Sequence, residues 1–348
     1  MTTGAGLVDR IWYGDSYWRW ALLPFSVLFG LLSAGRRKLY ESGIRHAVDL
    51  GRPVLVVGNI TAGGTGKTPI ALWLAERLKE YGMRPGIVSR GYRGRLGPQP
   101  LRVLTDSDPA VVGDEALLME RRQICPVVVH PDRVAAARLL LQLDCNVIVS
   151  DDGLQHFRLR RLHEIAVVDA ARGFGNGLLL PAGPLREPVS RLSTVDRIFV
   201  QREPAGSATR PLHLPSNVPQ ASFELVPGAV CNLADSRRAR LEDFRGKTVH
   251  AVAAIGNPGR FFRLLQRSGI EVIPHAHTDH AKLAPQDLQF DDGLDVLMTE
   301  KDAVKAGGIA TAACWYVTVD VQFPGGDTQA WLDEVYREMT GREAKSAV

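Results

Sequence analysis

The sequence has few cysteines and little net charge. Its 348 residues include 4 cysteines, which lie far apart and form no CxxC pair. This scarcity excludes a disulfide framework and a zinc site built on cysteine, and it indicates a reducing compartment. The formal net charge of +4 is too small to indicate nucleic acid as a partner. With 45% hydrophobic residues the chain can build a sizeable core, and disorder, collagen and a coiled coil are excluded.

An apolar run of full membrane-spanning length is also missing. The N-terminal segment Trp20–Leu32 has thirteen residues without a charge, whereas a helix that crosses a bilayer needs roughly 20 apolar residues. Pro24 and Gly30 weaken it further as a spanning helix. Tryptophans and tyrosines precede the segment and an Arg-Arg-Lys run follows it, which suits a segment lying in a membrane interface. A buried helix packed on the first domain is the alternative left open.

After residue 52, short β-branched runs alternate with amphipathic helical periods. Such alternation is typical of a parallel sheet covered on both faces. A second α/β set begins near Asp196, and the Pro-, Ser- and Gly-rich stretch Arg202–Pro227 is expected to be a linker or hairpin. Candidate strands are Pro53–Gly58, Gly86–Ser89, Val127–His130, Asn146–Ser150, Ile165–Asp169, Arg197–Gln201, Val249–Ile255, Leu294–Thr299 and Trp315–Val319. Candidate helices are Pro69–Tyr81, Asp132–Gln142, Gly259–Ser268 and Thr328–Met339.

The strongest motif is a glycine-rich loop that follows a buried strand and opens a helix. It reads GNITAGGTGKTP from Gly58, a phosphate-binding loop in which Thr61 replaces the usual first glycine. Backbone N–H groups at the glycines would face phosphate oxygens, Lys67 would neutralise the β- and γ-phosphates, and the Thr68 hydroxyl would bind Mg²⁺. The alternative is a glycine-rich turn without a ligand. The expected nucleotide contacts are Thr61, Ala62, Gly63, Gly64, Thr65, Gly66, Lys67 and Thr68.

The second motif is VIVSDDGLQH, from Val147 to His156. Apolar strand residues that end in two acids are typical of a Walker B strand, whose carboxylate holds Mg²⁺ directly or through water. Asp151 and Asp152 are therefore predicted metal ligands. An Asp-Gly turn that only caps the strand is the alternative.

The alternating strands and helices, the two motifs and the N-terminal apolar segment together predict an α/β fold: a P-loop NTPase-type parallel-sheet domain with a second, smaller α/β domain and an N-terminal interfacial helix. The expected division is an N-terminal membrane-associated amphipathic segment at 1–40, a P-loop domain at 41–195 and a smaller α/β domain at 196–327. A C-terminal helix at 328–348 is expected to pack back on the core.

ATP is favoured over GTP as the nucleotide. An Asn-Lys-x-Asp loop, which reads guanine, is absent, and the sequence Thr299-Glu-Lys-Asp has its lysine one place late. Ala62 stands where dimerising P-loop ATPases carry a lysine before the paired glycines. Neither feature of guanine or dimer-forming enzymes is therefore present.

Several polar groups outside these motifs could hold a substrate or take a proton. Asp114 precedes an apolar helix and is either a helix cap or the carboxylate that accepts a proton from the acceptor hydroxyl. Arg133 begins a helix after a strand, and Arg186 and Glu187 lie in a proline-rich loop. The sequence HAHTDH from His275 has no common zinc spacing, so a surface loop or a hydrogen-bonding histidine is favoured over a metal site.

These motifs together resemble the tetraacyldisaccharide 4′-kinase family of lipid A biosynthesis. The matching segments run in family order from about residue 20 to 305. SDDGLQH and PAGPLREP are specific to that family. The other matching segments are GNITAGGTGKTP, SRGYRG, GDEALLM, HPDR, TDH and LMTEKDAVK.

The resemblance implies an activity and a location. Such kinases use Mg²⁺ and transfer the γ-phosphate of ATP to the 4′-hydroxyl of a tetra-acylated glucosamine disaccharide 1-phosphate, giving lipid IVA. They are peripheral proteins of the cytoplasmic face of the bacterial inner membrane, bound through an N-terminal amphipathic helix. The lipid is thus the expected partner; protein partners are not indicated.

The resemblance also implies roles for individual residues. Asp114 matches the catalytic base and His280 the histidine paired with it, although Ala281 and Lys282 follow His280 where the family often has a second histidine or an aromatic residue. Lys67 matches the lysine of the phosphate loop. Further nucleotide contacts match Arg133, Gln155 and Arg186, and the metal ligands match Thr68, Asp151, Asp152 and Glu187.

Two other functions remain as alternatives. The first is a P-loop nucleotide switch, such as a GTPase that loads metal into other proteins, with the segment from His275 to His280 as its metal site. The second is a membrane-associated binding protein with a degenerate ATP site. The missing guanine loop argues against the first, and the intact Lys67, Thr68, Asp151 and Asp114 argue against the second.

Overall fold

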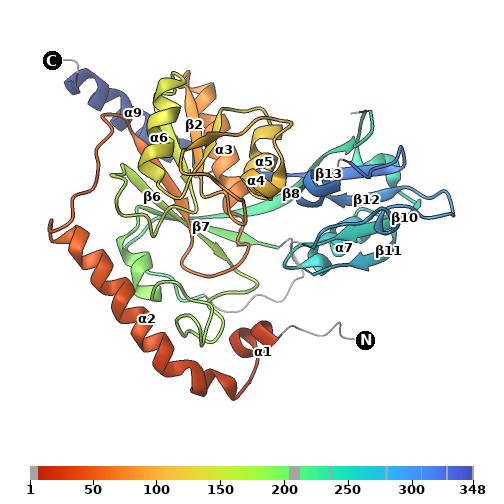
Figure 1. Ribbon diagram of the computed structural model, residues 1–348, viewed down its shortest axis with the longest axis horizontal. Coiled ribbons are helices and arrows are strands. Elements are labelled where there is room, and N and C mark those ends of the chain that lie inside the picture. Colours follow the sequence, from red (N-terminus) through yellow and green to blue (C-terminus); the bar gives the residue numbers. More distant parts are fainter. Residues whose placement is uncertain are drawn as a thin grey trace.

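The computed structural model describes residues 7–203, 212–235, 237–278, 281–306, 308–326 and 328–346. Their strands form one 13-stranded sheet that runs across the molecule (Figure 1). The strands are β1 Val54–Gly58, β2 Pro85–Ser89, β3 Leu101–Arg102, β4 Val127–Val129, β5 Val147–Asp151, β6 His163–Asp169, β7 Arg197–Arg202, β8 Gln220–Asn232, β9 Arg238–Ala239, β10 Thr248–Ala253, β11 Glu271–Ala276, β12 Val296–Thr299 and β13 Cys314–Gln322. The order is β11-β10-β12-β13-β8-β7-β6-β1-β5-β2-β4-β3, with β9 paired to β8.

The first lobe is built on the strands from β7 to β4, which are parallel, with β3 antiparallel at the edge. Because neighbouring residues of a strand point to opposite faces, Leu55 and Val57 enter one core while Val54 and Val56 enter the other. Helices cover both faces, as the sequence predicts. The helices are α1 Leu7–Tyr13, α2 Trp18–Glu41, α3 Lys67–Glu80, α4 Pro109–Val112, α5 Asp114–Arg121, α6 Arg133–Gln142, α7 Pro258–Arg267, α8 Glu300–Ala306 and α9 Thr328–Ser346, with 3₁₀ turns η1 Val189–Thr194, η2 Leu241–Phe244 and η3 Pro285–Asp287.

Strand β8 joins the two lobes. Its first residues pair with β7 in parallel, and the rest pairs with β13 in antiparallel. The expectation of a linker or hairpin up to Pro227 is wrong for the part that belongs to β8. Pro227 and Gly228 hide this strand in the sequence, and the ladder with β13 accommodates them through a register shift between Val317 and Val319.

The second lobe packs its own cores on β10, β12 and β13. Helix α7 covers one face, where Phe261 and Leu265 are buried, and α8 covers the other. The expected boundary at residue 195 falls between β6 and β7, which pair directly within the first lobe. The sheet continues across this boundary, so the strands do not mark a division between domains there. The predicted division into domains stays a prediction.

Helix α9 returns to the first lobe from the end of the chain. Trp331, Leu332, Val335 and Met339 are buried in the same core as α3. The Trp331 ring lies edge-on to Phe199 of β7, with 5.5 Å between ring centroids. The last helix thus closes one face of the P-loop lobe.

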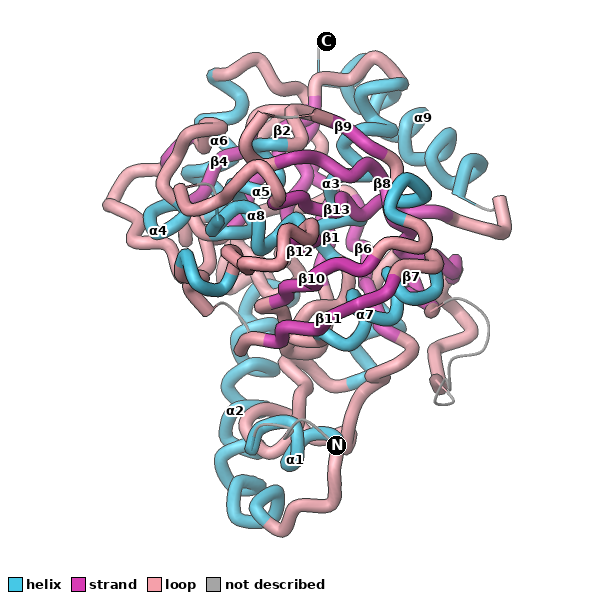
Figure 2. The backbone as a smooth tube through the Cα atoms, turned by 90° about the vertical axis from the view of Figure 1, so that its right-hand side faces the viewer, coloured by secondary structure: helices cyan, strands magenta, loops and turns pink. Residues whose placement is uncertain are grey.

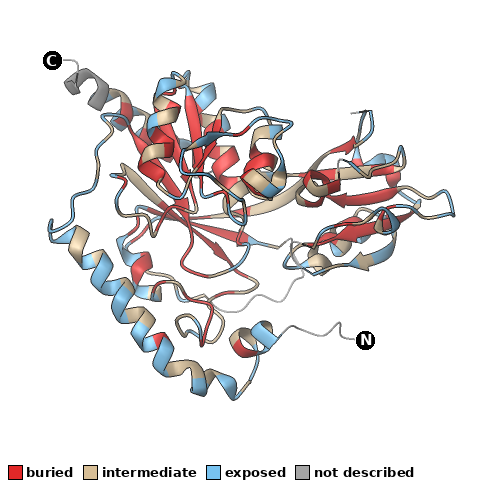
Figure 3. Ribbon diagram, in the orientation of Figure 1, coloured by how far each residue is buried: buried red, intermediate tan, exposed pale blue. Residues whose placement is uncertain are grey.

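Helices α1 and α2 extend away from the sheet (Figure 2). Helix α2 has 24 residues, and its 18-residue window with a mean hydropathy of 1.2 is only 6% buried. By length and composition it could cross a membrane, so the expectation that this segment is too short is not upheld. Most of its surface is exposed (Figure 3), and Ser26 is its buried residue. Large exposed apolar side chains on it are Trp18, Trp20, Phe25, Val27, Leu28, Leu31 and Leu32.

Candidate active site

The glycine-rich loop lies between β1 and α3, as the motif predicts. Gly63 has φ 112° and Gly66 has φ 81°, backbone conformations that residues with a Cβ rarely adopt. Helix α3 begins at Lys67, so its unpaired N–H groups face the loop. Lys67 Nζ donates to the Gly63 carbonyl oxygen at 3.4 Å and lies 3.7 Å from Asp152 Oδ1. The loop thus offers backbone donors and one cation to an anion.

Asn59, which the sequence analysis does not single out, braces this loop. Its side chain is fully buried directly after β1. Asn59 Nδ2 donates to Thr65 Oγ1 at 3.0 Å and to Thr61 Oγ1 at 3.3 Å. Thr61 therefore holds the loop through its hydroxyl group, which a glycine at this position could not do. The sequence feature that could have indicated Asn59 is its position inside the glycine-rich motif, directly after the strand.

The two aspartates at the end of β5 have opposite electrostatic environments. Asp151 is buried, and burial together with the nearby Glu115 and Asp152 raises its pKa to about 7. Asp151 Oδ1 has no hydrogen-bond partner among the described residues. For Asp152, burial favours a higher pKa, but Lys67 and Arg186 lower it to about 2. Arg186 Nη1 donates to both Asp152 oxygens at 2.8 Å. Ser89 Oγ donates to the other oxygen of Asp151, Oδ2, at 3.4 Å, so Asp151 is a buried carboxylate with one oxygen left without a partner in the part of the chain that the structure describes.

Arg133 donates hydrogen bonds to the backbone at the end of the Walker B strand β5. Its side chain is 2% exposed, and Nη2 donates to the Asp151 carbonyl oxygen at 3.0 Å. Nη1 donates to the His130 carbonyl oxygen at 3.3 Å. Burial lowers the pKa of Arg133 to about 10, so the guanidinium remains charged at neutral pH. Its charge lies close to both aspartates.

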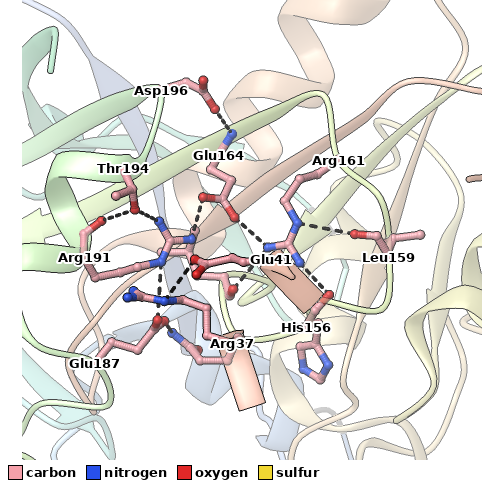
Figure 4. Close-up of polar contacts among 12 residues, drawn as sticks. Arg37, Glu41, His156, Leu159, Arg161, Glu164, Glu187, Arg191, Thr194 and Asp196 are labelled. Carbon is pink, nitrogen blue, oxygen red and sulfur yellow. Dashed lines mark hydrogen bonds and ion pairs between the residues drawn. The ribbon is translucent and has the colours of Figure 1, made fainter. Parts of the chain in front are cut away.

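Glu187 lies in a buried network of charges (Figure 4). Its Oε1 accepts from Gln155 Nε2 at 2.7 Å, and its Oε2 lies 3.3 Å from Arg191 Nε. Arg191 in turn pairs with Glu164 of β6, which also accepts from Arg161 Nη1 at 2.7 Å. The figure shows Arg37 of α2 beside this network. The structure therefore brings Gln155 and Glu187 together, and it adds Arg191, which sequence reasoning missed.

Asp114 is the first residue of α5, after Gly113 with φ 88°. The next residue, Glu115, is near enough to Asp151 for its charge to raise that pKa, so this helix turn lies beside the Walker B strand. Lys301 of α8 donates to Glu115 Oε1 at 3.2 Å from the second lobe. The predicted partner His280 lies outside the described residues.

The histidine-rich segment contributes to a strand. His275 and Ala276 belong to β11, and His275 Nε2 lies 2.9 Å from His250 Nδ1. His250 Nε2 is 2.9 Å from Asp292 Oδ2. The hydrogen-bonding interpretation therefore holds for His275. In the described ranges, which omit positions 279 and 280, no three His, Cys, Asp or Glu side chains gather in an arrangement that could hold a metal ion.

A parallel sheet with a glycine-rich loop, a loop lysine and paired acids at the carboxyl end of the neighbouring strand defines a P-loop nucleotide-binding protein. The loop and the acids occupy these places on β1 and β5, which are paired. A family model described as Tetraacyldisaccharide-1-P 4′-kinase matches residues 18–337. The chain belongs to this family.

Individual relatives agree with the family match. The chain is 47% identical over 325 residues to the tetraacyldisaccharide 4′-kinase of Nitrosococcus oceani, covering 93% of each protein. It is 50% identical over 303 residues to that of Alkalilimnicola ehrlichii, covering 87% of this chain and 88% of the relative. A crystal structure of LpxK from Aquifex aeolicus in complex with ATP superposes with a TM-score of 0.78 and 28% identity, covering 92% of this chain and 99% of that one.

These findings confirm the predicted family, the α/β fold class with its parallel sheet and apolar N-terminal helix, and the ATP-dependent kinase function. They give no support to the GTPase alternative. The roles of single residues are not tested by them and stay predictions.

The contrast between the two aspartates predicts opposite effects on stability in the metal-free, nucleotide-free protein. Between about pH 4 and pH 7 the unfolded state has released the proton of Asp151 while the folded state keeps it. The raised pKa of Asp151 therefore lowers the free energy of unfolding as the pH rises from about 4 to 7. Asp151→Asn should raise the unfolding temperature by a few degrees at pH 8 and change it little at pH 4. The measurement is thermal unfolding at both pH values with a chelator present.

Asp152→Asn is the matched control. The folded-state pKa of Asp152 is lowered, so its charge stabilises the fold above about pH 4, and this stabilisation is lost as pH falls toward 2. The variant should unfold at a lower temperature than the parent at pH 8. If both variants shift the unfolding temperature in the same direction, the assigned environments are wrong.

Proposed function

We propose that the protein transfers the γ-phosphate of ATP to the 4′-hydroxyl of a tetra-acylated glucosamine disaccharide 1-phosphate, which yields lipid IVA. The observation that carries this proposal is the convergence of Lys67 and Asp152, at 3.7 Å, beside Asp151, whose buried Oδ1 has no partner among the described residues. These three side chains suit phosphoryl transfer, which depends on positioning and charge neutralisation. The acceptor follows from membership of the tetraacyldisaccharide 4′-kinase family.

Mg²⁺ is the proposed metal, and the donors present fit it. Magnesium is usually held by one or two carboxylates together with phosphate oxygens and water. Asp151 Oδ1 is buried and lacks a partner among the described residues, so it is the carboxylate oxygen ready for a cation. Thr68 in the first turn of α3 and Asp152 would complete the protein's share, with Glu187 held nearby by Gln155 and Arg191. The bound ion would neutralise charge on the transferring phosphoryl group.

The remaining residues have distinct proposed tasks. Lys67 and Arg186 would supply positive charge to the phosphates, and Arg133 would support the Walker B backbone. Asp114 would orient the sugar hydroxyl and accept its proton, with His280 as its partner. Lys67 is the first residue of α3, and Asp114 is the first residue of α5.

A lipid acceptor explains the exposed apolar helix. Helix α2 presents Phe25, Leu28, Leu31 and Leu32 away from the body, each more than half exposed. We place this face in the cytoplasmic leaflet of the bacterial inner membrane, as a peripheral attachment that brings the active site to its substrate. Arg36 and Lys38 at the end of the helix suit anionic headgroups.

Charged residues on this face should weaken membrane binding. Leu28→Asp and Leu31→Asp together should weaken binding to anionic phospholipid vesicles at least about tenfold, because apolar surface is lost and like charges are added. Vesicle sedimentation of the full chain measures this. Ile44→Asp is the control, since Ile44 is 72% exposed but lies after α2. Unchanged sedimentation of the double variant would remove α2 from the membrane contact.

The test of the function is a kinase assay. The full chain is incubated with ATP, Mg²⁺ and detergent-dispersed tetra-acyl disaccharide 1-phosphate, and the lipid is analysed by mass spectrometry. A product heavier by one phosphate, formed by the parent and lost with Asp114→Ala, supports the reaction and the base. Absence of product from a folded, ATP-binding parent protein would overturn the proposed activity.

A further inference from the structure

The segment after β6, residues 170–186, lies between the N-terminal helices and the phosphate loop, and we call it the bridging segment. On one side it holds α1: Asn176 Nδ2 donates to the Ile11 carbonyl oxygen at 3.1 Å, and Trp12 Nε1 donates to the Pro181 carbonyl oxygen at 3.0 Å. It also holds α2, because Ser26 Oγ donates to the Leu179 carbonyl oxygen at 2.8 Å. The segment is thus fixed to both N-terminal helices.

On its other side the bridging segment is fixed to the glycine-rich loop. The Ala62 N–H donates to the Pro184 carbonyl oxygen at 2.7 Å, and the Arg186 N–H donates to the Ile60 carbonyl oxygen at 2.7 Å. Thr61 forms an isolated β-bridge with Leu185. The backbone of the loop and the N-terminal helices therefore share one support.

Arg172 in the bridging segment contacts both partners with its side chain. A Cβ placed on Gly63 would lie 3.2 Å from Arg172 Nη1, so the guanidinium lies against the backbone of the glycine-rich loop at Gly63. Arg172 Nη2 lies 3.6 Å from Asp9 Oδ1, and its Cζ is 5.1 Å from the centre of the Tyr13 ring, both in α1. Lys67 reaches the same loop residue, through its carbonyl oxygen, at 3.4 Å. The cationic groups of Lys67 and Arg172 therefore both lie next to Gly63.

We propose that Arg172 is a further phosphate-binding residue of the nucleotide site, and that Asp9 of α1 is the partner its guanidinium exchanges for phosphate when the nucleotide binds. This inference rests on the proposed function. A nucleoside triphosphate brings more negative charge than Lys67 can balance, and Lys67 is already shared with Asp152. The planar guanidinium of arginine suits phosphate oxygens. Its present partner Asp9 is 46% exposed, and a solvent-exposed pair of this kind is weak enough to exchange for phosphate.

A purely structural role would make Arg172 an anchor for α1. Two variants separate the roles, because Arg172→Ala removes the cation whereas Asp9→Asn removes only its partner on α1. If Arg172 binds phosphate, Arg172→Ala weakens nucleotide binding about 10- to 100-fold, and Asp9→Asn leaves it unchanged or slightly tighter. If Arg172 only anchors α1, both variants alter vesicle binding alike and neither alters nucleotide affinity.

The experiment is titration of the full chain in detergent with a fluorescent ATP analogue and Mg²⁺, followed by KM and kcat for ATP. Arg172→Lys should restore part of the affinity, and it keeps the test decisive if the alanine variant misfolds. Arg160→Ala is the matched control, since it removes an arginine paired with Asp49 at 3.0 Å on the surface. It should leave affinity unchanged.

Lys67→Ala distinguishes failure of this inference from failure of the proposed function. If Lys67→Ala weakens nucleotide binding and Arg172→Ala does not, the phosphate role of Arg172 is overturned while the nucleotide site stands. If neither variant alters binding, the loop is not the nucleotide site, and both the inference and the proposed function fall.

Discussion

Replacing Lys67 by alanine is expected to lower kcat/KM by about three orders of magnitude without unfolding the protein. The lysine carries the positive charge of the glycine-rich loop toward the phosphoryl group that is transferred. Its contacts within the protein, at 3.4 Å to the Gly63 carbonyl oxygen and 3.7 Å to Asp152, are long. Asp152 also keeps Arg186 as its partner. Loss of Lys67 should therefore remove transition-state stabilisation rather than structure.

The measurement is initial rates against ATP concentration, together with thermal unfolding. Lys79→Ala is the control in the same helix, since Lys79 donates to the Ile124 carbonyl oxygen at 3.1 Å, away from the loop. It should keep turnover close to that of the parent. A Lys67→Ala protein with parent-like rates would remove this residue from the mechanism.

Asp114→Asn should lower kcat by about 10²- to 10⁴-fold, because an amide cannot accept the proton of the attacking hydroxyl. Asparagine keeps the volume of the side chain, and the N-cap of α5 is Gly113, so the change leaves the start of the helix in place. The substitution therefore separates a structural role of Asp114 at the start of the helix from the role of base. The measurement is kcat as a function of pH for the parent and the variant.

The outcome depends on which role is correct. For a base, the variant loses both the rate and the fall of kcat toward low pH that belongs to this carboxylate. If the side chain of Asp114 only supports the start of α5, Asp114→Asn stays active while Asp114→Ala loses stability. Asp108, which caps α4 by accepting from the Ala110 N–H at 2.8 Å, gives the control: Asp108→Asn should leave kcat unchanged.

The parts of the site that the sequence predicts are those encoded by contiguous residues. The glycine-rich loop and the Asp151–Asp152 pair each follow an apolar strand, and parallel strands bring their carboxyl ends to one edge. Lys67 and the two aspartates could therefore be placed together from spacing alone. The aromatic and cationic flanks of the N-terminal apolar segment are also contiguous, and they favoured an interfacial segment while leaving a buried helix open.

The parts that sequence reasoning missed depend on contacts between distant segments. Arg172 reaches Gly63 only because the bridging segment folds back beneath the loop, and no local pattern marks it. Arg191 acquires its place through Glu164 and Glu187, which come from different elements. Strand β8 was missed because Pro227 and Gly228 argue locally against a strand, while pairing with β7 and β13 overrides that preference.

The return of α9 to the first lobe has a consequence for synthesis of the chain. The core around α3 is completed by Trp331, Leu332, Val335 and Met339, whereas the strands of that lobe end at residue 202. While the ribosome makes the second lobe, the first lobe has all its strands but lacks the helix that covers one apolar face. Because exposed apolar surface promotes aggregation, the nascent protein needs shielding until its last helix emerges. The apolar face around α3 is therefore covered only after the segment that forms α9 has been made, although the strands of the P-loop lobe are complete long before.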